Sequence, residues 1–157
     1  VVQLFALLLL VRFLVPYKDK LKSMFTKFQW NLLHTAGLLL AVKIVLQSIT
    51  TFPYFANLAA TILDFTVGYL HLTFLGAVTI GLFLFLDYLK FFKLSKKGYY
   101  LYLAGFILTE GLIFYKGFVI WQGLPLINGY FKLLMFGSLC IVLSLIYLFY
   151  FAKTSDD

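Results

Sequence analysis

Charged residues are scarce in this sequence. Aspartate, glutamate, lysine and arginine make up 12% of its 157 residues, whereas 63% are hydrophobic, and the mean hydropathy is +0.99. A soluble domain of this size needs more polar surface than that. The composition therefore predicts an integral membrane protein whose surroundings are the lipid bilayer.

Cysteine and the common catalytic motifs are scarce too. Cys140 is the single cysteine and lies in the apolar stretch GSLCIVLSL. It cannot form a disulfide within the chain, and we expect it to be a small packing residue. The sequence contains no CxxC zinc motif, phosphate-binding glycine loop or nucleophile elbow. It therefore identifies no catalytic site and leaves enzyme activity open.

Long apolar runs predict the fold. A helix needs about 20 residues to cross about 30 Å of hydrocarbon. Four runs reach that length: Gln29–Thr50, Phe65–Leu86, Tyr99–Ile120 and Tyr130–Phe151. Together with a shorter run at residues 1–15 they predict an all-α, polytopic transmembrane bundle of about five helices, which forms one domain over residues 1–157. The segment FPYFANLAATILD is expected to form a short helix that caps this bundle.

The first run differs from the others in length. At about 1.5 Å per residue it reaches only about 23 Å. It also lacks the basic start and the small-residue cleavage site of a signal peptide. We interpret it as a truncated helix, and the chain as the C-terminal part of a longer protein.

Lysines lie in alternate connecting segments and predict the orientation. One group follows the first run and the other follows the third: Lys18, Lys20, Lys22 and Lys27, then Lys90, Lys93, Lys96 and Lys97. The segments TTFPYFANLAATILD and WQGLPLING contain no lysine or arginine. By the positive-inside rule, the basic segments and the C-terminus face the cytoplasm. This topology accounts for the net charge of +7, so no nucleic-acid partner is expected.

Aromatic residues gather near the predicted ends of the runs, as in interfacial belts. The inner group comprises Trp30, Tyr88, Tyr99, Tyr100 and Tyr102, and the outer group comprises Tyr54, Trp121 and Tyr130.

Two histidines lie inside the apolar runs, where ionisable groups are costly and indicate a functional site. His34 is about five residues from the inner end of its run, and His71 is about seven from the outer end of the next. Their depths then differ by roughly 13 Å. They are not expected to bind one haem iron together, and we interpret His34 as an interfacial or packing residue.

A polar cluster is predicted in the outer half. Lys43 lies at the depth of His71, with Gln47 one turn further on, and Asp64 shares a helix face with His71. Alternatively, Lys43 snorkels outward and pairs with Asp64 as interhelical glue. Glu110, near the middle of its run, is expected to be a proton relay or a neutral carboxyl that hydrogen-bonds across helices.

The segment DFTVGYLHLTFLGAV, residues 64–78, resembles the tenth helix of the catalytic subunit of haem-copper oxidases. There, two histidines at i and i+2 bind the two haems and Gly-Ala-Val follows. His71 matches the second histidine, and Tyr69 stands at the first. The five runs would correspond to helices eight to twelve of that family. The YLHL…LG pattern is also similar to uncharacterised polytopic membrane proteins of Bacteroidetes, which implies a bacterial inner membrane.

Two functions remain open. The resemblance implies no oxygen-reducing site, because Tyr69 replaces one ligand and the copper-binding helices are missing. It implies at most a haem b with His71 as an axial metal ligand, in electron transfer or in quinol or gas chemistry. The other hypothesis, which we favour, is a cofactor-free helical scaffold or accessory subunit of a larger membrane complex, in contact with other transmembrane helices.

Overall fold

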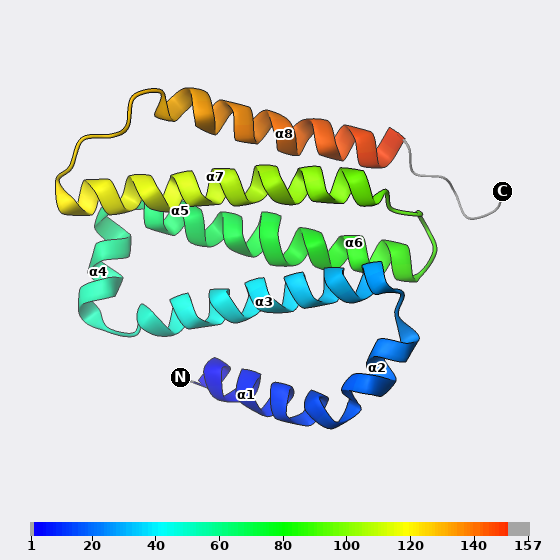
Figure 1. Cartoon of the computed structure of the whole chain (residues 1–157). Coiled ribbons are helices and arrows are strands. Elements are labelled where there is room, and N and C mark those ends of the chain that lie inside the picture. Colours follow the sequence, from blue (N-terminus) through cyan, green and yellow to red (C-terminus); the bar gives the residue numbers. More distant parts are fainter. Residues whose placement is uncertain (1, 151–157) are drawn as a thin grey trace.

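The computed structural model describes residues 2–150, and the regular structure within this range is helical throughout (Figure 1). The all-α fold class is therefore confirmed. In chain order the elements are α1 (Val2–Leu14), the 3₁₀ turn η1 (Val15–Tyr17), α2 (Lys18–Met24), α3 (Lys27–Ile49), α4 (Pro53–Thr61), α5 (Leu63–His71), the π-helical segment η2 (Leu72–Val78), α6 (Thr79–Tyr88), α7 (Lys96–Gln122) and α8 (Tyr130–Tyr150).

Four helical segments are long and apolar enough to cross a membrane. They are α3, the continuous run α5–η2–α6 (Leu63–Tyr88), α7 and α8. They coincide with the four long runs of the sequence to within a few residues, so the chain is a membrane-embedded helical protein. The shorter first run forms α1, which packs against α3 (Figure 1). Phe151, the last residue of the fourth long run, lies outside the described residues.

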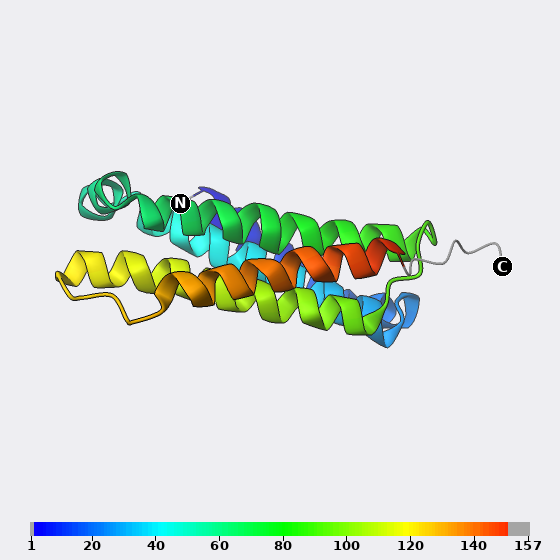
Figure 2. The ribbon, with the colours of Figure 1, turned by 90° about the horizontal axis from the view of Figure 1, so that it is seen from above.

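Successive spanning segments run antiparallel, and α7 is the most buried of them. Eleven of the 27 residues of α7 are buried, whereas only Phe28 and Leu32 are buried in α3. On one side α7 packs against α8, and on the other against α5; α3 packs in turn against η2 and α6 (Figures 1 and 2). On its other side α3 is contacted by α1 (Figure 1), and most α3 residues remain exposed or half-buried within the described chain.

The short helix α4 confirms the predicted cap. It lies crosswise over one end of the bundle (Figures 1 and 2). Pro53 begins it at a position where the missing N–H costs no hydrogen bond.

Both lysine-rich segments lie at one end of the bundle, and α4 and the α7–α8 connection lie at the other (Figure 1). We call these the lysine-rich and the lysine-poor end. At the lysine-rich end, Thr26 and Gln29 form a capping box that begins α3. The Gln29 Nε2 group also donates to Asp87 Oδ2 at 2.9 Å, and Asp87 Oδ1 accepts from the backbone N–H of Leu94 at 3.0 Å. One carboxylate therefore holds the start of α3, the end of α6 and the next loop together.

Tyrosine placement corrects part of the belt prediction. Tyr88 and Tyr100 are exposed, as a belt requires, but Tyr99 and Tyr102 are each only 1% exposed and belong to the core. Tyr130 is also buried. The reason is that residues three apart on a helix share a face, and the face of α7 with Tyr99 and Tyr102 packs against its neighbours.

Candidate functional site

The π-helical segment η2 interrupts the α-helical spanning run α5–η2–α6. The backbone N–H of Thr79 bonds to Phe74, five residues back, and to Gly76, instead of to Leu75 as it would in an α-helix. The Tyr102 hydroxyl of α7 donates to this Leu75 carbonyl at 2.6 Å. A carbonyl without a partner in hydrocarbon costs several kcal/mol, so Tyr102 compensates for the π-helical offset.

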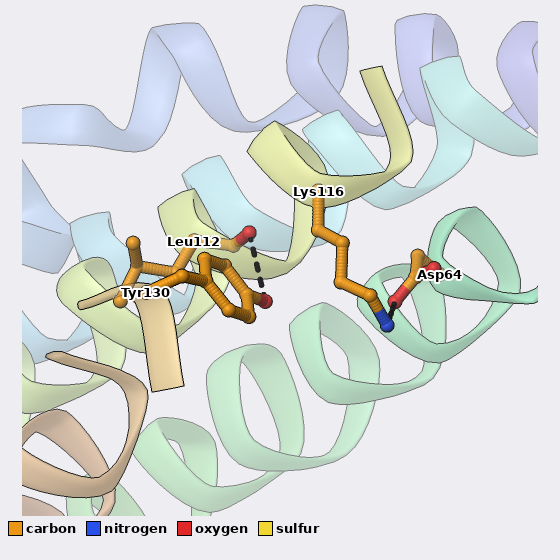
Figure 3. A network of polar contacts seen from close by, with 4 residues as sticks. All are labelled: Asp64, Leu112, Lys116 and Tyr130. Carbon is orange, nitrogen blue, oxygen red and sulfur yellow. Dashed lines mark hydrogen bonds and ion pairs between the residues drawn. The ribbon is translucent and has the colours of Figure 1, made fainter. Parts of the chain in front are cut away.

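An ion pair joins α5 to α7 in the lysine-poor half. The Lys116 ammonium lies 2.8 Å from Asp64 Oδ1, and their side chains are 30% and 19% exposed. Beside it, the Tyr130 hydroxyl of α8 donates to the Leu112 carbonyl at 3.2 Å. Figure 3 shows Lys116 reaching toward Asp64, with the Tyr130 ring on the other side of the same helix turn. Three helices thus contribute polar groups to one region.

These groups line a cavity of about 340 Å³ between α5, α7 and α8, and His71 lies in its wall. The Nδ1 atom of His71 is buried and has no hydrogen-bond partner among residues 2–150. Thr109 and Ser138 are further polar wall residues. Asp64 and His71 share this cavity because seven residues are nearly two helical turns, as the sequence predicted.

Lys43 is separated from Asp64, which corrects the alternative in which these two residues pair. The Lys43 ammonium donates to Gln47 Oε1 at 2.7 Å, and the Tyr69 hydroxyl is 3.4 Å from the same oxygen. The Lys43 nitrogen also lies 5.7 Å from the centre of the Tyr69 ring. Five residues separate Asp64 from Tyr69, which is about 140° of rotation. Asp64 therefore faces α7, whereas Tyr69 faces α3 and Lys43.

A second, larger cavity of about 550 Å³ lies beside this Lys43 group, between α3, α4, α5 and α7. Gln47 and Tyr69 belong to its wall. Most of the wall is apolar, and it is rich in aromatic rings: Phe55, Phe65, Tyr69, Phe114, Phe118 and Trp121. The predicted polar cluster is thus two clusters, each beside a cavity of its own.

Glu110 is buried in α7, at 8% exposure. Both carboxyl oxygens lack a hydrogen-bond partner within the described chain, so the predicted bond across helices is absent there. Phe106 and Phe114, one turn on either side of Glu110, lie against Gly76 and Gly68. Glu110 therefore lies on the α7 face that packs against α5 and η2, close to the level of His71.

Within residues 2–150 no three histidine, cysteine or carboxylate side chains are grouped to hold a metal ion. His34 is exposed on α3, in the lysine-rich half, and does not approach His71. This agrees with the depth estimate from the sequence.

Three contributors were missed from the sequence: Lys116, Tyr130 and Tyr102. Lys116 lies near the end of an apolar run, where a lysine is ordinarily interfacial, and the two tyrosines fitted a belt. Their hydrogen bonds follow from packing across 52, 18 and 27 residues of chain. No local pattern signals such partners.

The fold and these groups define a class: a membrane-embedded helical bundle with ionisable residues around two cavities. Comparison with known proteins adds no family, since no family model, curated protein or solved structure matches this chain. The resemblance to the haem-copper oxidase subunit stays a prediction.

Proposed function

We propose that this protein is a helical subunit of a larger membrane assembly, and that a transmembrane helix of a partner packs on an exposed face of α3. We define this α3 outer face by Asn31, His34, Gly37 and Leu38, which recur at helical spacing. The observation that carries the proposal is that polar groups are exposed on this face at membrane depth.

His34 is the central residue of the face. It is exposed, and its side chain makes no hydrogen bond to the described residues. It lies seven residues beyond Lys27, the first residue of α3, or about 10 Å along the helix axis. Lipid tails cannot accept or donate a hydrogen bond, so an imidazole at that depth requires a polar partner.

Gly37 and Leu38 make the same face suitable for close helix packing. No atom lies within 4 Å of the position that a Gly37 Cβ would occupy, and Leu38 is 57% exposed. A glycine beside a polar side chain is typical of transmembrane helix interfaces, because it lets two backbones approach and bond. The expected occupant is an apolar helix with a hydrogen-bonding side chain opposite His34.

Photo-crosslinking in native membranes tests the proposal. A photoreactive amino acid at Leu38 should give a polypeptide adduct that is lost in His34→Leu. The matched control is the same probe at Leu143 of α8, which is 58% exposed and should give lipid adducts. An adduct with a second copy of this chain would identify the partner as a homo-oligomer. Lipid adducts alone at Leu38 would contradict the proposal.

The proposal includes the cellular orientation. The lysine-rich end faces the cytoplasm, in a bacterial inner membrane, because lysine in short loops is retained on that side. What supports it is the collection of both lysine groups at one end of the bundle (Figure 1).

A second candidate is a haem b protein with His71 as axial ligand. His71 lies in the wall of a cavity, and its buried Nδ1 atom makes no hydrogen bond to the described residues. The fit is partial, because the described chain supplies no second histidine there. The second ligand would have to come from a partner helix, and a bound haem would add redox chemistry. A reduced-minus-oxidised spectrum of the purified protein should show a haem band that His71→Ala removes; absence of the band from wild type eliminates this candidate.

A further inference from the structure

We propose that the larger cavity binds the carboxylate of a fatty acid, with Lys43 as the counter-ion for the head group and the aromatic walls around the acyl chain. This site lies away from the α3 outer face, and it does not depend on a partner subunit.

Lys43 carries a charge with no opposite charge beside it among the described residues. Within the described chain its ammonium lies within 4 Å of no carboxylate, since the single ion pair there joins Lys116 to Asp64. Its contacts are the neutral Gln47 amide at 2.7 Å and the face of the Tyr69 ring. Lys43 is half-buried, and cations at membrane depth ordinarily pair with an anion. An anionic ligand would supply the counter-ion that the described residues do not provide.

The larger cavity lies beside Lys43. Lys43 is not itself a wall residue, but both of its contacts are: Gln47 and Tyr69 line the cavity. Its ammonium therefore contacts a polar part of the wall of a mostly apolar space. The volume of about 550 Å³ lies within the range of about 300–1,000 Å³ that small-molecule sites occupy. A ligand there needs an apolar body and one anionic end.

The depth of Lys43 in the membrane determines which anionic group can reach it. Lys43 lies six residues before Ile49, the last residue of α3, which is about 9 Å below the end of the helix. A phospholipid phosphate stays at the interface and would have to be drawn that far into the hydrocarbon. A carboxylic acid is smaller and can enter the membrane in its neutral form. The structure therefore favours a free fatty acid over a phospholipid.

The wall explains how the acyl chain is held. Five of the six aromatic residues in the wall are phenylalanine or tryptophan. Helix α4 closes the lysine-poor side of the cavity with Phe55, Leu58 and Ala59. Aromatic and aliphatic walls provide dispersion contacts without polar groups that an acyl chain would leave unpaired. Ala59 is the smallest of these residues, so enlarging it should fill the cavity and leave Lys43 in place.

Binding of palmitate to the purified full chain in nanodiscs tests the proposal, with methyl palmitate as the uncharged comparison. Palmitate should bind to wild type and to Lys43→Arg. Its dissociation constant should rise about tenfold or more in Lys43→Met, and Ala59→Phe should abolish binding. Lys132→Met, which removes an exposed lysine of α8, is the control and should bind as wild type does.

Three results would overturn the proposal. They are equal affinity of wild type for palmitate and methyl palmitate, unchanged palmitate affinity in Ala59→Phe, and displacement of palmitate by phosphatidylglycerol at equal concentration. The last result would assign the site to a phospholipid. If Lys43→Met does not fold, Ala59→Phe and the ester comparison still decide, because neither removes the lysine.

Discussion

The Asp64–Lys116 ion pair connects two spanning helices through single side chains, and a double-mutant cycle isolates its contribution. Asp64→Asn leaves a half-buried ammonium without its counter-ion, and Lys116→Met leaves a carboxylate alone. Each is expected to lower the free energy of unfolding by roughly 1–3 kcal/mol. The double variant should recover part of this loss, since no charge is then left unpaired. Denaturation in mixed micelles measures all four proteins; strictly additive effects would contradict the pairing.

Tyr102 offers a second residue-scale prediction, because its hydroxyl satisfies the carbonyl that the π-helical segment frees. Tyr102→Phe removes that donor and keeps the ring. We expect a loss of about 1–2 kcal/mol in unfolding free energy, visible as a lower thermal midpoint in detergent. Tyr100→Phe is the matched control, since Tyr100 is a neighbouring tyrosine of α7 that is 52% exposed. Equal effects of the two variants would show that the Leu75 contact contributes nothing.

At the scale of elements, the α7–α8 contact depends on glycine at the crossing. A Cβ at Gly105 would lie 3.0 Å from the backbone oxygen of Gly137, and one at Gly137 would lie 2.8 Å from Thr109 Cγ2. Small residues of this kind let transmembrane helices approach closely. The backbone oxygen cannot move aside as a flexible side chain can.

The α7–α8 contact predicts opposite effects on stability for alanine substitutions at two glycines of α7. Gly105→Ala should separate α7 from α8 and cost about 1–3 kcal/mol. Gly111→Ala meets no atom within 4 Å and should be neutral or stabilise the protein by up to about 1 kcal/mol, because alanine is the better helix former. Thermal unfolding of both variants is the measurement. A stable Gly105→Ala protein would indicate that the two helices are not packed this closely.

For the molecule as a whole, orientation is the property that the charge pattern predicts. In a background where Cys140 is replaced by alanine, a cysteine at Asn57 of α4 should react with an impermeant maleimide on intact cells. A cysteine at Ser95, beside the lysines at the start of α7, should react only after the membrane is opened. The reverse pattern would refute the orientation, and with it the correspondence to helices eight to twelve of the oxidase subunit.

The sequence predicted much of this architecture. The four spanning segments, the cap α4 and the grouping of lysines follow from hydropathy and charge, which are local sums over about 20 residues. Such sums do not depend on which helices pack against one another, so the predictions made from them hold for the folded protein. The shared face of Asp64 and His71 was predictable for the same reason, since seven residues always come back to one side of a helix.

Only the tertiary structure determines which side chains pair with one another. Asp64 pairs with Lys116 instead of Lys43 because the rotation of α5 turns position 64 toward α7 and position 69 toward α3. The burial of Tyr99 and Tyr102 and the division of one predicted cluster between two cavities depend on the same rotations. Hydropathy determines how deep a residue lies, but the angle at which its helix packs determines what it touches. That angle results from contacts between segments far apart in the sequence.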